Sequence, residues 1–138
     1  MKNVKIKDVI LDGEEIDIMD EIPEAIDWLV GNLLTEGYQA DFTLNGLKEI
    51  DRFMEEEKNG IIAINPGSIL FAIAAYVGQT AIMLYGGEWV VDNDDPDNIE
   101  VHLKNDIKIW PGQKVMKKYL NDEESIYTYI SSLKNIKE

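Results

Sequence analysis

One short segment of the chain, residues 92–98, concentrates oxygen ligands. Four carboxylates stand there within six residues: Asp92, Asp94, Asp95 and Asp97. Carboxylate oxygens are the ligands that calcium prefers, but a helix–loop–helix calcium site also needs Gly at its sixth position and Glu at its twelfth. Counted from Asp92, the sixth position of this chain is Asp97 and the twelfth is Leu103. The segment is therefore predicted to be a polar hairpin loop. Its four aspartates are candidate ligands for a divalent cation, and no cofactor is expected.

A second pattern combines the same loop with residues farther along the chain. Pro96-Asp97 followed by Asp106-Ile107-Lys108 matches the order Pro-Asp, then Asp-x-Lys, of metal-dependent nucleases. In that chemistry two carboxylates hold the cation and the lysine lies beside the attacked phosphate. Asp106 is expected in a turn, however, and a net charge of −14 repels a polyanion. A metal-dependent phosphodiesterase is therefore the least favoured of the three functions considered.

The residues of nucleophilic and zinc chemistry are scarce. His102 is the single histidine and the chain has no cysteine. A structural or catalytic zinc site needs several such ligands, and no serine follows the strand–turn–helix pattern that would pair it with His102 as a base. His102 is predicted to be an ordinary strand residue. No catalytic residue is assigned, and a binding protein is favoured over an enzyme.

A candidate ligand pocket comes from polar and aromatic residues in and after an otherwise apolar segment. Tyr76, Gln79, Thr80 and Met83 recur at helical spacing, and two tryptophans follow within the predicted strands. The pocket would be lined by Tyr76, Gln79, Trp89 and Trp110. The alternative is that the Gln79 side chain forms its hydrogen bonds with backbone groups and that both tryptophans pack in the hydrophobic core.

The acidic charge is concentrated in the N-terminal part of the chain. Residues 8–47 hold eleven Asp and Glu and no Lys or Arg, whereas residues 99–138 hold seven Lys against six acids. Such a surface disfavours nucleic acid and could attract a basic protein, although solvated surface charge explains it equally. The candidate partner-binding residues are Glu14, Glu15, Asp17, Asp20, Glu21, Glu24 and Asp27.

Five helices are expected from apolar periodicity and end signals. They cover roughly residues 22–36, 44–57, 66–85, 111–121 and 123–135. Pro23 is placed in the first turn of the first helix, and Asn121 or Asp122 is expected to cap the last one. The run 69–85 has 17 residues without a charge. It is shorter than a typical span and lacks basic flanks, so a buried central helix is predicted and not a membrane span.

Three strands are expected near residues 88–92, 99–104 and 107–110, forming an antiparallel meander. Residues 4–11 alternate loosely, so residues 1–20 could add an edge strand or an arm. The chain of 138 residues is therefore predicted to be one α+β domain, with about five helices packed on one face of a small three-stranded sheet. The lack of cysteine and of a signal-peptide pattern favours a cytoplasmic location.

Several short motifs resemble those of a group of small bacterial proteins of unknown function. They are Tyr76-x-Gly78, Gly86-Gly87-x-Trp89, Trp110-Pro111 with Lys117 or Lys118, and an acidic step into a tyrosine-bearing helix at 122–129. In that group a Tyr-x-Gly-Glu helix leads into Gly-Gly-x-Trp and later Trp-Pro. The resemblance covers roughly residues 47–133. Gln79 stands where the group has Glu, and an amide does not titrate, so the resemblance implies no acid–base role here.

The resemblance implies a bacterial, cytosolic α+β domain without an established reaction. By analogy, some small acidic bacterial proteins are immunity partners of toxins. The leading hypothesis is a non-enzymatic, immunity-type inhibitor whose acidic N-terminal half engages a basic protein, for example a toxin nuclease. The second is a small-molecule-binding or regulatory domain that uses the pocket between the central helix and the sheet. The oligomeric state is left open.

Overall fold

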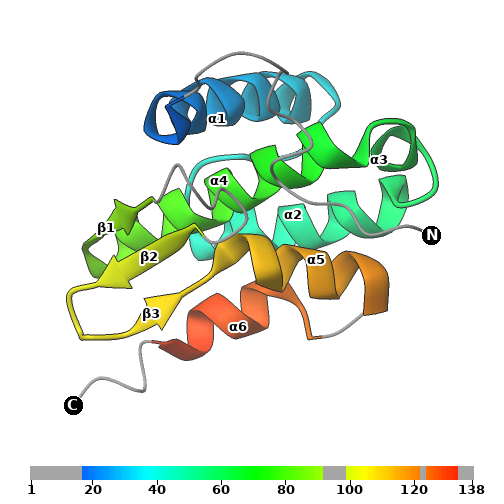
Figure 1. Ribbon diagram of the computed structural model, residues 1–138. Coiled ribbons are helices and arrows are strands. Elements are labelled where there is room, and N and C mark those ends of the chain that lie inside the picture. The colour runs from blue at the N-terminus through cyan, green and yellow to red at the C-terminus, as the bar shows by residue number, and fades with distance from the viewer. Residues whose placement is uncertain (1–16, 92–98, 122–123, 134–138) are drawn as a thin grey trace.

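The computed structural model describes residues 17–91, 99–121 and 124–133. These residues form six helices and one three-stranded antiparallel sheet (Figure 1), which confirms the predicted α+β class. The elements are α1 (Ile18–Thr35), α2 (Leu44–Glu57), α3 (Ile61–Ile64), α4 (Pro66–Tyr85), β1 (Gly87–Val90), β2 (Glu100–Leu103), β3 (Lys108–Ile109), α5 (Pro111–Asn121) and α6 (Ile126–Ser132). The short α3, in which only Ile62 is buried, was not predicted.

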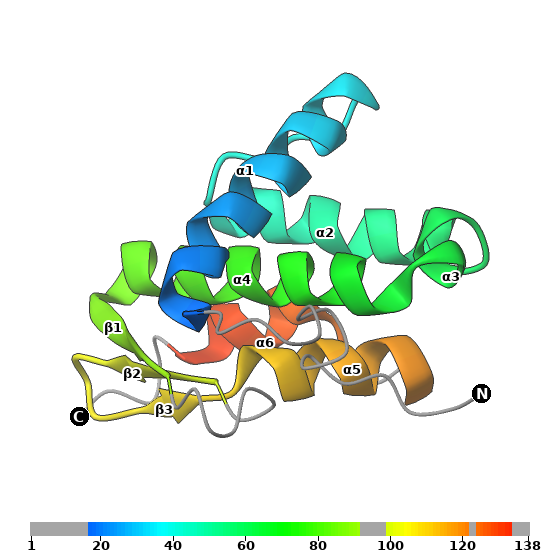
Figure 2. The same cartoon turned by 45° about the horizontal axis from the view of Figure 1, so that its top comes forward.

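The centre of the fold is α4. Every residue from 69 to 78 is buried, so the helix has no polar face and must be covered on all sides. α1 crosses one side of it, α2 runs along another, and α5 and the sheet cover the rest (Figures 1 and 2). α4 is long and apolar enough to span a membrane by length and composition, but about two thirds of its apolar stretch is enclosed by these elements. The prediction of a buried central helix is therefore confirmed.

The first helix begins one turn earlier than predicted. The Asp17 carboxylate accepts a hydrogen bond of 3.0 Å from the Met19 backbone N–H and so caps α1. Pro23 consequently lies inside the helix and not in its first turn. Burial of Ile18 and Ile22 on the side facing the core extends the helix past the proline, because this packing outweighs the one backbone hydrogen bond that proline cannot make.

The C-terminal end of α1 matches its sequence signal. Gly37 adopts a φ of 91°, and the Tyr38 N–H bonds to the Leu33 carbonyl at 2.8 Å. The Gly37 N–H bonds to the Leu34 carbonyl, so the helix ends in a Schellman motif. The chain then crosses to α2, whose N-cap is Thr43: the Thr43 hydroxyl accepts from the Gly46 N–H at 3.1 Å.

The sheet has the predicted order β1-β2-β3, with Trp89 opposite Val101 and Val101 opposite Ile109. These three residues face α4, whereas His102 lies on the other face, where its Nε2 is 2.6 Å from Glu100. The Trp89 indole packs directly over Gly78 of α4, the residue at which a Cβ would lie 2.8 Å from the ring Cζ2. Only glycine allows the sheet to approach the helix this closely.

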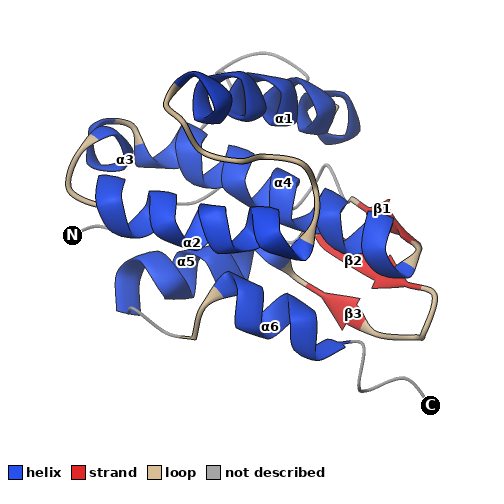
Figure 3. Ribbon diagram, turned by 180° about the vertical axis from the view of Figure 1, so that it is seen from behind, coloured by secondary structure: helices blue, strands red, loops and turns tan. Residues whose placement is uncertain are grey.

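The last helix is anchored from another element. Both carboxylate oxygens of Asp51 in α2 accept hydrogen bonds, from the N–H groups of Ile126 and Tyr127 at 2.8 and 3.0 Å. Ser125 is the N-cap, with its hydroxyl accepting from the Thr128 N–H. α6 thus begins later than predicted: Asn121 belongs to α5, and Asp122 lies outside the described residues. Figure 3 shows α6 beneath α2 on the side of the molecule away from α1.

The inward face of α5 was predicted in part. Val115 and Tyr119 are buried, but Leu120 is 39% exposed and Lys118 is only 8% exposed. The Lys118 ammonium lies 3.1 Å from Glu55, so its aliphatic stem can cover apolar surface while the charge is paired. The ion pair with α2 explains why a lysine, and not Leu120, takes the inward position.

The close contact between Gly78 and Trp89 yields a first prediction. Gly78→Ala should destabilise the protein by about 2 kcal/mol or more, because the added methyl group overlaps the indole. Gly31→Ala is the matched control: Gly31 is also inside a helix, but a Cβ there meets nothing within 4 Å. It should stabilise by about 0.5–1 kcal/mol through helix propensity. Urea denaturation measures both, and equal effects would contradict the close packing.

The anchoring of α6 yields a second prediction. Asp51→Ala should cost about 1–2 kcal/mol of stability, because two backbone N–H groups lose a charged acceptor. Asp51→Asn keeps one side-chain oxygen and should lose less. Thermal unfolding followed by circular dichroism gives the order wild type, Asn variant, Ala variant. Identical losses for the two variants would show that the carboxylate does not act as the cap.

Candidate functional site

The predicted partner-binding acids gather on the exposed side of α1. Asp17, Asp20, Glu24 and Asp27 are exposed and Glu21 is half-buried. The spacing of Asp20, Glu24 and Asp27 places them along one side of the helix. α1 carries no lysine or arginine. Glu14 and Glu15, the other two members of the predicted set, lie outside the described residues.

The α1 acids are not used inside the described part of the molecule, apart from Asp17, which caps the helix. Among the described residues, no ion pair or side-chain hydrogen bond involves Asp20, Glu21, Glu24 or Asp27. Asp20 and Glu21 lie in the first turn, where a negative charge favours the helix dipole. Glu24 and Asp27 lie beyond the reach of that effect.

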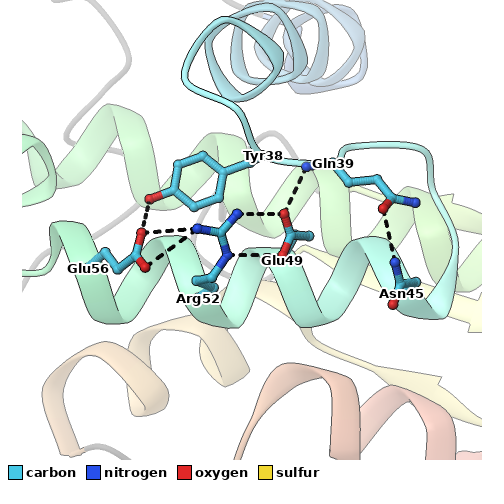
Figure 4. A network of polar contacts seen from close by, with 6 residues as sticks. All are labelled: Tyr38, Gln39, Asn45, Glu49, Arg52 and Glu56. Atoms are coloured by element: carbon cyan, nitrogen blue, oxygen red, sulfur yellow. Dashed lines mark hydrogen bonds and ion pairs between the residues drawn. The ribbon is translucent and has the colours of Figure 1, made fainter.

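The acids of α2 behave differently, as Figure 4 shows. Arg52 forms an ion pair of 2.8 Å with Glu49, and its guanidinium lies 4.3 Å from the centre of the Tyr38 ring. Glu49 also accepts from the Gln39 backbone N–H at 2.9 Å. The hydrogen bonds from Arg52 and Gln39 lower the pKa of Glu49 to about 2. Burial and a 2.6 Å hydrogen bond to Glu56 raise the pKa of Tyr38 to about 12.

Most other carboxylates outside α1 also have partners. Asp51 caps α6, Glu55 pairs with Lys118, Glu100 contacts His102, and Glu124 pairs with Lys114 at 3.0 Å. These acids hold one element of the fold to another or fix a side chain. The α1 acids therefore form the largest group of carboxylates that the described fold does not employ.

A groove lies beside the acidic side of α1. It has a volume of about 440 Å³ and separates the first half of α1 from the end of α4 and from β1. Its lining residues, among those described, are Met19, Ile22, Pro23, Ile26, Asp27, Gln79 and Trp89. The Trp89 Nε1–H donates a hydrogen bond of 3.1 Å to the Gln79 Oε1. The groove is thus mainly apolar, with Asp27 shared between its wall and the acidic side of the helix.

The four residues of the predicted ligand pocket are divided by the structure. Gln79 and Trp89 are bonded to each other and line the groove. Tyr76 is fully buried; its hydroxyl accepts from the Phe42 N–H at 3.0 Å, and burial raises its pKa. Trp110 is half-buried between β3 and α5 and is not among the groove residues.

The α1 residues of the groove were not identified from the sequence. Met19, Pro23 and Asp27 follow one another at intervals of four residues, and Ile22 and Ile26 lie next to them on the helix. This is helical spacing. The predicted start at residue 22 excluded Met19, and the groove itself arises only where α1 crosses α4 near β1.

The metal hypotheses have limited structural support. Asp92, Asp94, Asp95 and Asp97 lie outside the described residues. Within the described residues, no group of three or more His, Asp or Glu side chains is arranged to hold a metal ion. Asp106 is in a turn with a φ of 67°, as the sequence predicted.

Comparison with known proteins adds no family. No protein-family model, curated protein or solved structure matches the chain. The resemblance to small bacterial proteins with the Tyr-x-Gly-Glu, Gly-Gly-x-Trp and Trp-Pro motifs therefore stays a prediction.

The network around Arg52 yields a third prediction. Arg52→Gln should raise the pKa of Glu49 from about 2 towards its ordinary value, because the guanidinium hydrogen bonds are its main cause. Carbon-detected NMR titration of the side-chain carboxyls measures this shift. Asp41 is the internal control, since its pKa is lowered by Thr43 and Gln39. An unchanged Glu49 titration would contradict the assigned cause.

The same shift sets the direction of a pH dependence. The pKa of Glu49 is lower in the folded chain than the ordinary 4.5, so its contribution to stability is present above that pH and is lost as the pH falls towards about 2. Between those values the wild-type protein should lose stability more steeply than the Arg52→Gln variant.

Proposed function

We propose that this chain is a non-enzymatic binding protein of the inhibitor or immunity type, and that α1 engages a basic protein partner. The observation that carries the proposal is the contrast between acids. The carboxylates of α2, and that of Glu124 just before α6, are paired within the fold. Glu24 and Asp27, by contrast, have no partner among the described residues. A structural role within the fold explains the first group but not the second.

Electrostatics support the choice of a basic partner. Like charges one turn apart on a helix repel each other, so a helix side carrying Asp20, Glu24 and Asp27 is less stable alone than beside cations. A net charge of −14 also steers basic proteins towards the chain from a distance. The same field disfavours nucleic acid. A bacterial and cytoplasmic origin fits the proposal but is not required by it.

A small-molecule-binding or regulatory domain is the second candidate. It is favoured by one observation: the groove volume of about 440 Å³ is in the range of ligand pockets, and Gln79 and Trp89 line it. Half of the predicted pocket, Tyr76 and Trp110, does not contribute. A metal-dependent phosphodiesterase remains the least favoured function, because Asp106 lies in a turn and a net charge of −14 repels a polyanion.

Charge reversal on α1 tests the proposal. The Asp20→Lys/Glu24→Lys variant should lose a basic protein that the wild type captures at low salt from the organism encoding the chain. With the purified partner, affinity should fall at least about tenfold, because opposite charges become like charges. Affinity chromatography followed by mass spectrometry identifies the partner, and calorimetry measures the affinity.

The control is Glu36→Lys/Glu88→Lys. Glu36 caps the C-terminal end of α1, and Glu88 points to the face of β1 opposite Trp89; both are exposed, and neither lines the groove. Replacing two acids by two lysines gives this variant the same net charge as the first. It should retain most of the affinity. Equal losses in the two variants would attribute binding to net charge alone, and no loss in either would refute α1 as the binding surface.

A further inference from the structure

We propose that the groove between α1, α4 and β1 receives a peptide segment of the basic partner, with an apolar side chain in the groove and an adjacent basic side chain on Asp27. This inference rests on the proposed function, since it names how the partner is held. It goes beyond it by assigning a defined anchor site, and not only a charged surface.

The walls of the groove fit an apolar side chain. Met19 and Pro23 are the exposed apolar residues that α1 contributes, with the buried Ile22 and Ile26 beneath them, and Trp89 adds its ring from the sheet. Met19 is 46% exposed, so its side chain is accessible at the groove. A volume of about 440 Å³ is enough for two or three side chains. The groove can therefore hold a short peptide segment.

One wall of the groove is rigid before any ligand arrives. The Trp89 ring is held from one side by the backbone of Gly78 and at its edge by the hydrogen bond to Gln79. A side chain that is already ordered loses little entropy on binding, and this favours affinity. Trp89 thus has the properties of a preformed contact surface.

The polar atoms of the groove fit a peptide main chain. Because the Trp89 indole can only donate, it fixes the Gln79 Oε1 towards itself and leaves the Gln79 amide N–H groups as donors. Those donors match a peptide carbonyl. Pro23 lacks an N–H, so the Met19 carbonyl has no helical donor four residues on.

Asp27 determines the charge of the preferred segment. Asp27 is one of the groove residues, and its side chain has no partner among the described residues, so it fits an arginine or lysine next to the apolar anchor. A second copy of this chain fits less well, because the two acidic α1 helices would be brought together. The charges therefore favour a basic peptide over self-association.

Indole N–H resonances in two-dimensional ¹H–¹⁵N NMR spectra test the inference. The chain has three tryptophans: Trp89 reports on the groove, Trp110 is a reference outside it, and Trp28 reports on the exposed side of α1. The probes are acetyl-Leu-Arg-Leu-amide and its acidic counterpart acetyl-Leu-Glu-Leu-amide. The arginine peptide should shift Trp89 saturably and leave Trp110 unchanged, and the glutamate peptide should bind at least about tenfold more weakly.

Two pairs of variants locate the contacts. Asp27→Asn should weaken the arginine peptide at least about threefold, whereas Glu36→Gln, at the far end of α1 and outside the groove, should not. Met19→Ala should weaken it similarly, whereas Leu34→Ala should not, because Leu34 is exposed on α1 but outside the groove. All four side chains are exposed, so the variants should fold as the wild type does.

The outcomes separate this inference from the proposed function. Equal affinity for both peptides, no shift of Trp89, or no effect of Asp27→Asn and Met19→Ala would overturn the groove site. Loss of the partner on α1 charge reversal alone would then still support the acidic surface. A Trp89 shift that depends on protein concentration without peptide would place a second copy in the groove and overturn the inference as well.

Discussion

The fold depends on one constraint, the need to enclose α4. A helix buried over ten consecutive residues has no side that can face water, so each remaining element is positioned by the part of α4 that it covers. α1, α2, α5 and the sheet approach from different directions (Figure 2). The sheet alone is too small to form a second core, and it reaches α4 through Trp89 because Gly78 leaves room for the indole.

Polar contacts then fix the outer elements to one another. Asp51 orients α6 on α2, and Lys118 ties α5 to Glu55 of α2. α2 is consequently the helix to which α5 and α6 are tied by charged side chains, and most of its acidic residues form ion pairs or hydrogen bonds within the fold. α1 stands apart: it is held through apolar residues such as Ile22 and Leu29, and its carboxylates other than Asp17 form no ion pair or side-chain hydrogen bond within the described residues. The division between structural and available acids follows from where each helix packs.

Much of this architecture could be predicted from the sequence, and the exceptions have physical causes. The uncharged run in α4 and the caps Thr43 and Gly37 are local signals, and the structure confirms them. The start of α1 was missed because tertiary packing of Ile18 outweighs the proline signal at Pro23. The capping of α6 by Asp51 joins residues 75 positions apart, which no local pattern reveals. Gln79 and Trp89 were foreseen in a pocket, but their α1 counterparts depend on the crossing of two helices.

The isolation of α1 has a consequence for how the molecule responds to its ionic surroundings. At physiological ionic strength, dissolved ions largely screen interactions between exposed charges more than about 8 Å apart, and they weaken those at shorter range in part. In the free chain they would weaken the repulsion among the α1 carboxylates and so stabilise α1 in its packing against α4. At the same time they would screen the attraction between these carboxylates and a basic partner of the kind proposed above. Higher ionic strength would therefore stabilise the free chain and, at the same time, weaken its affinity for such a partner.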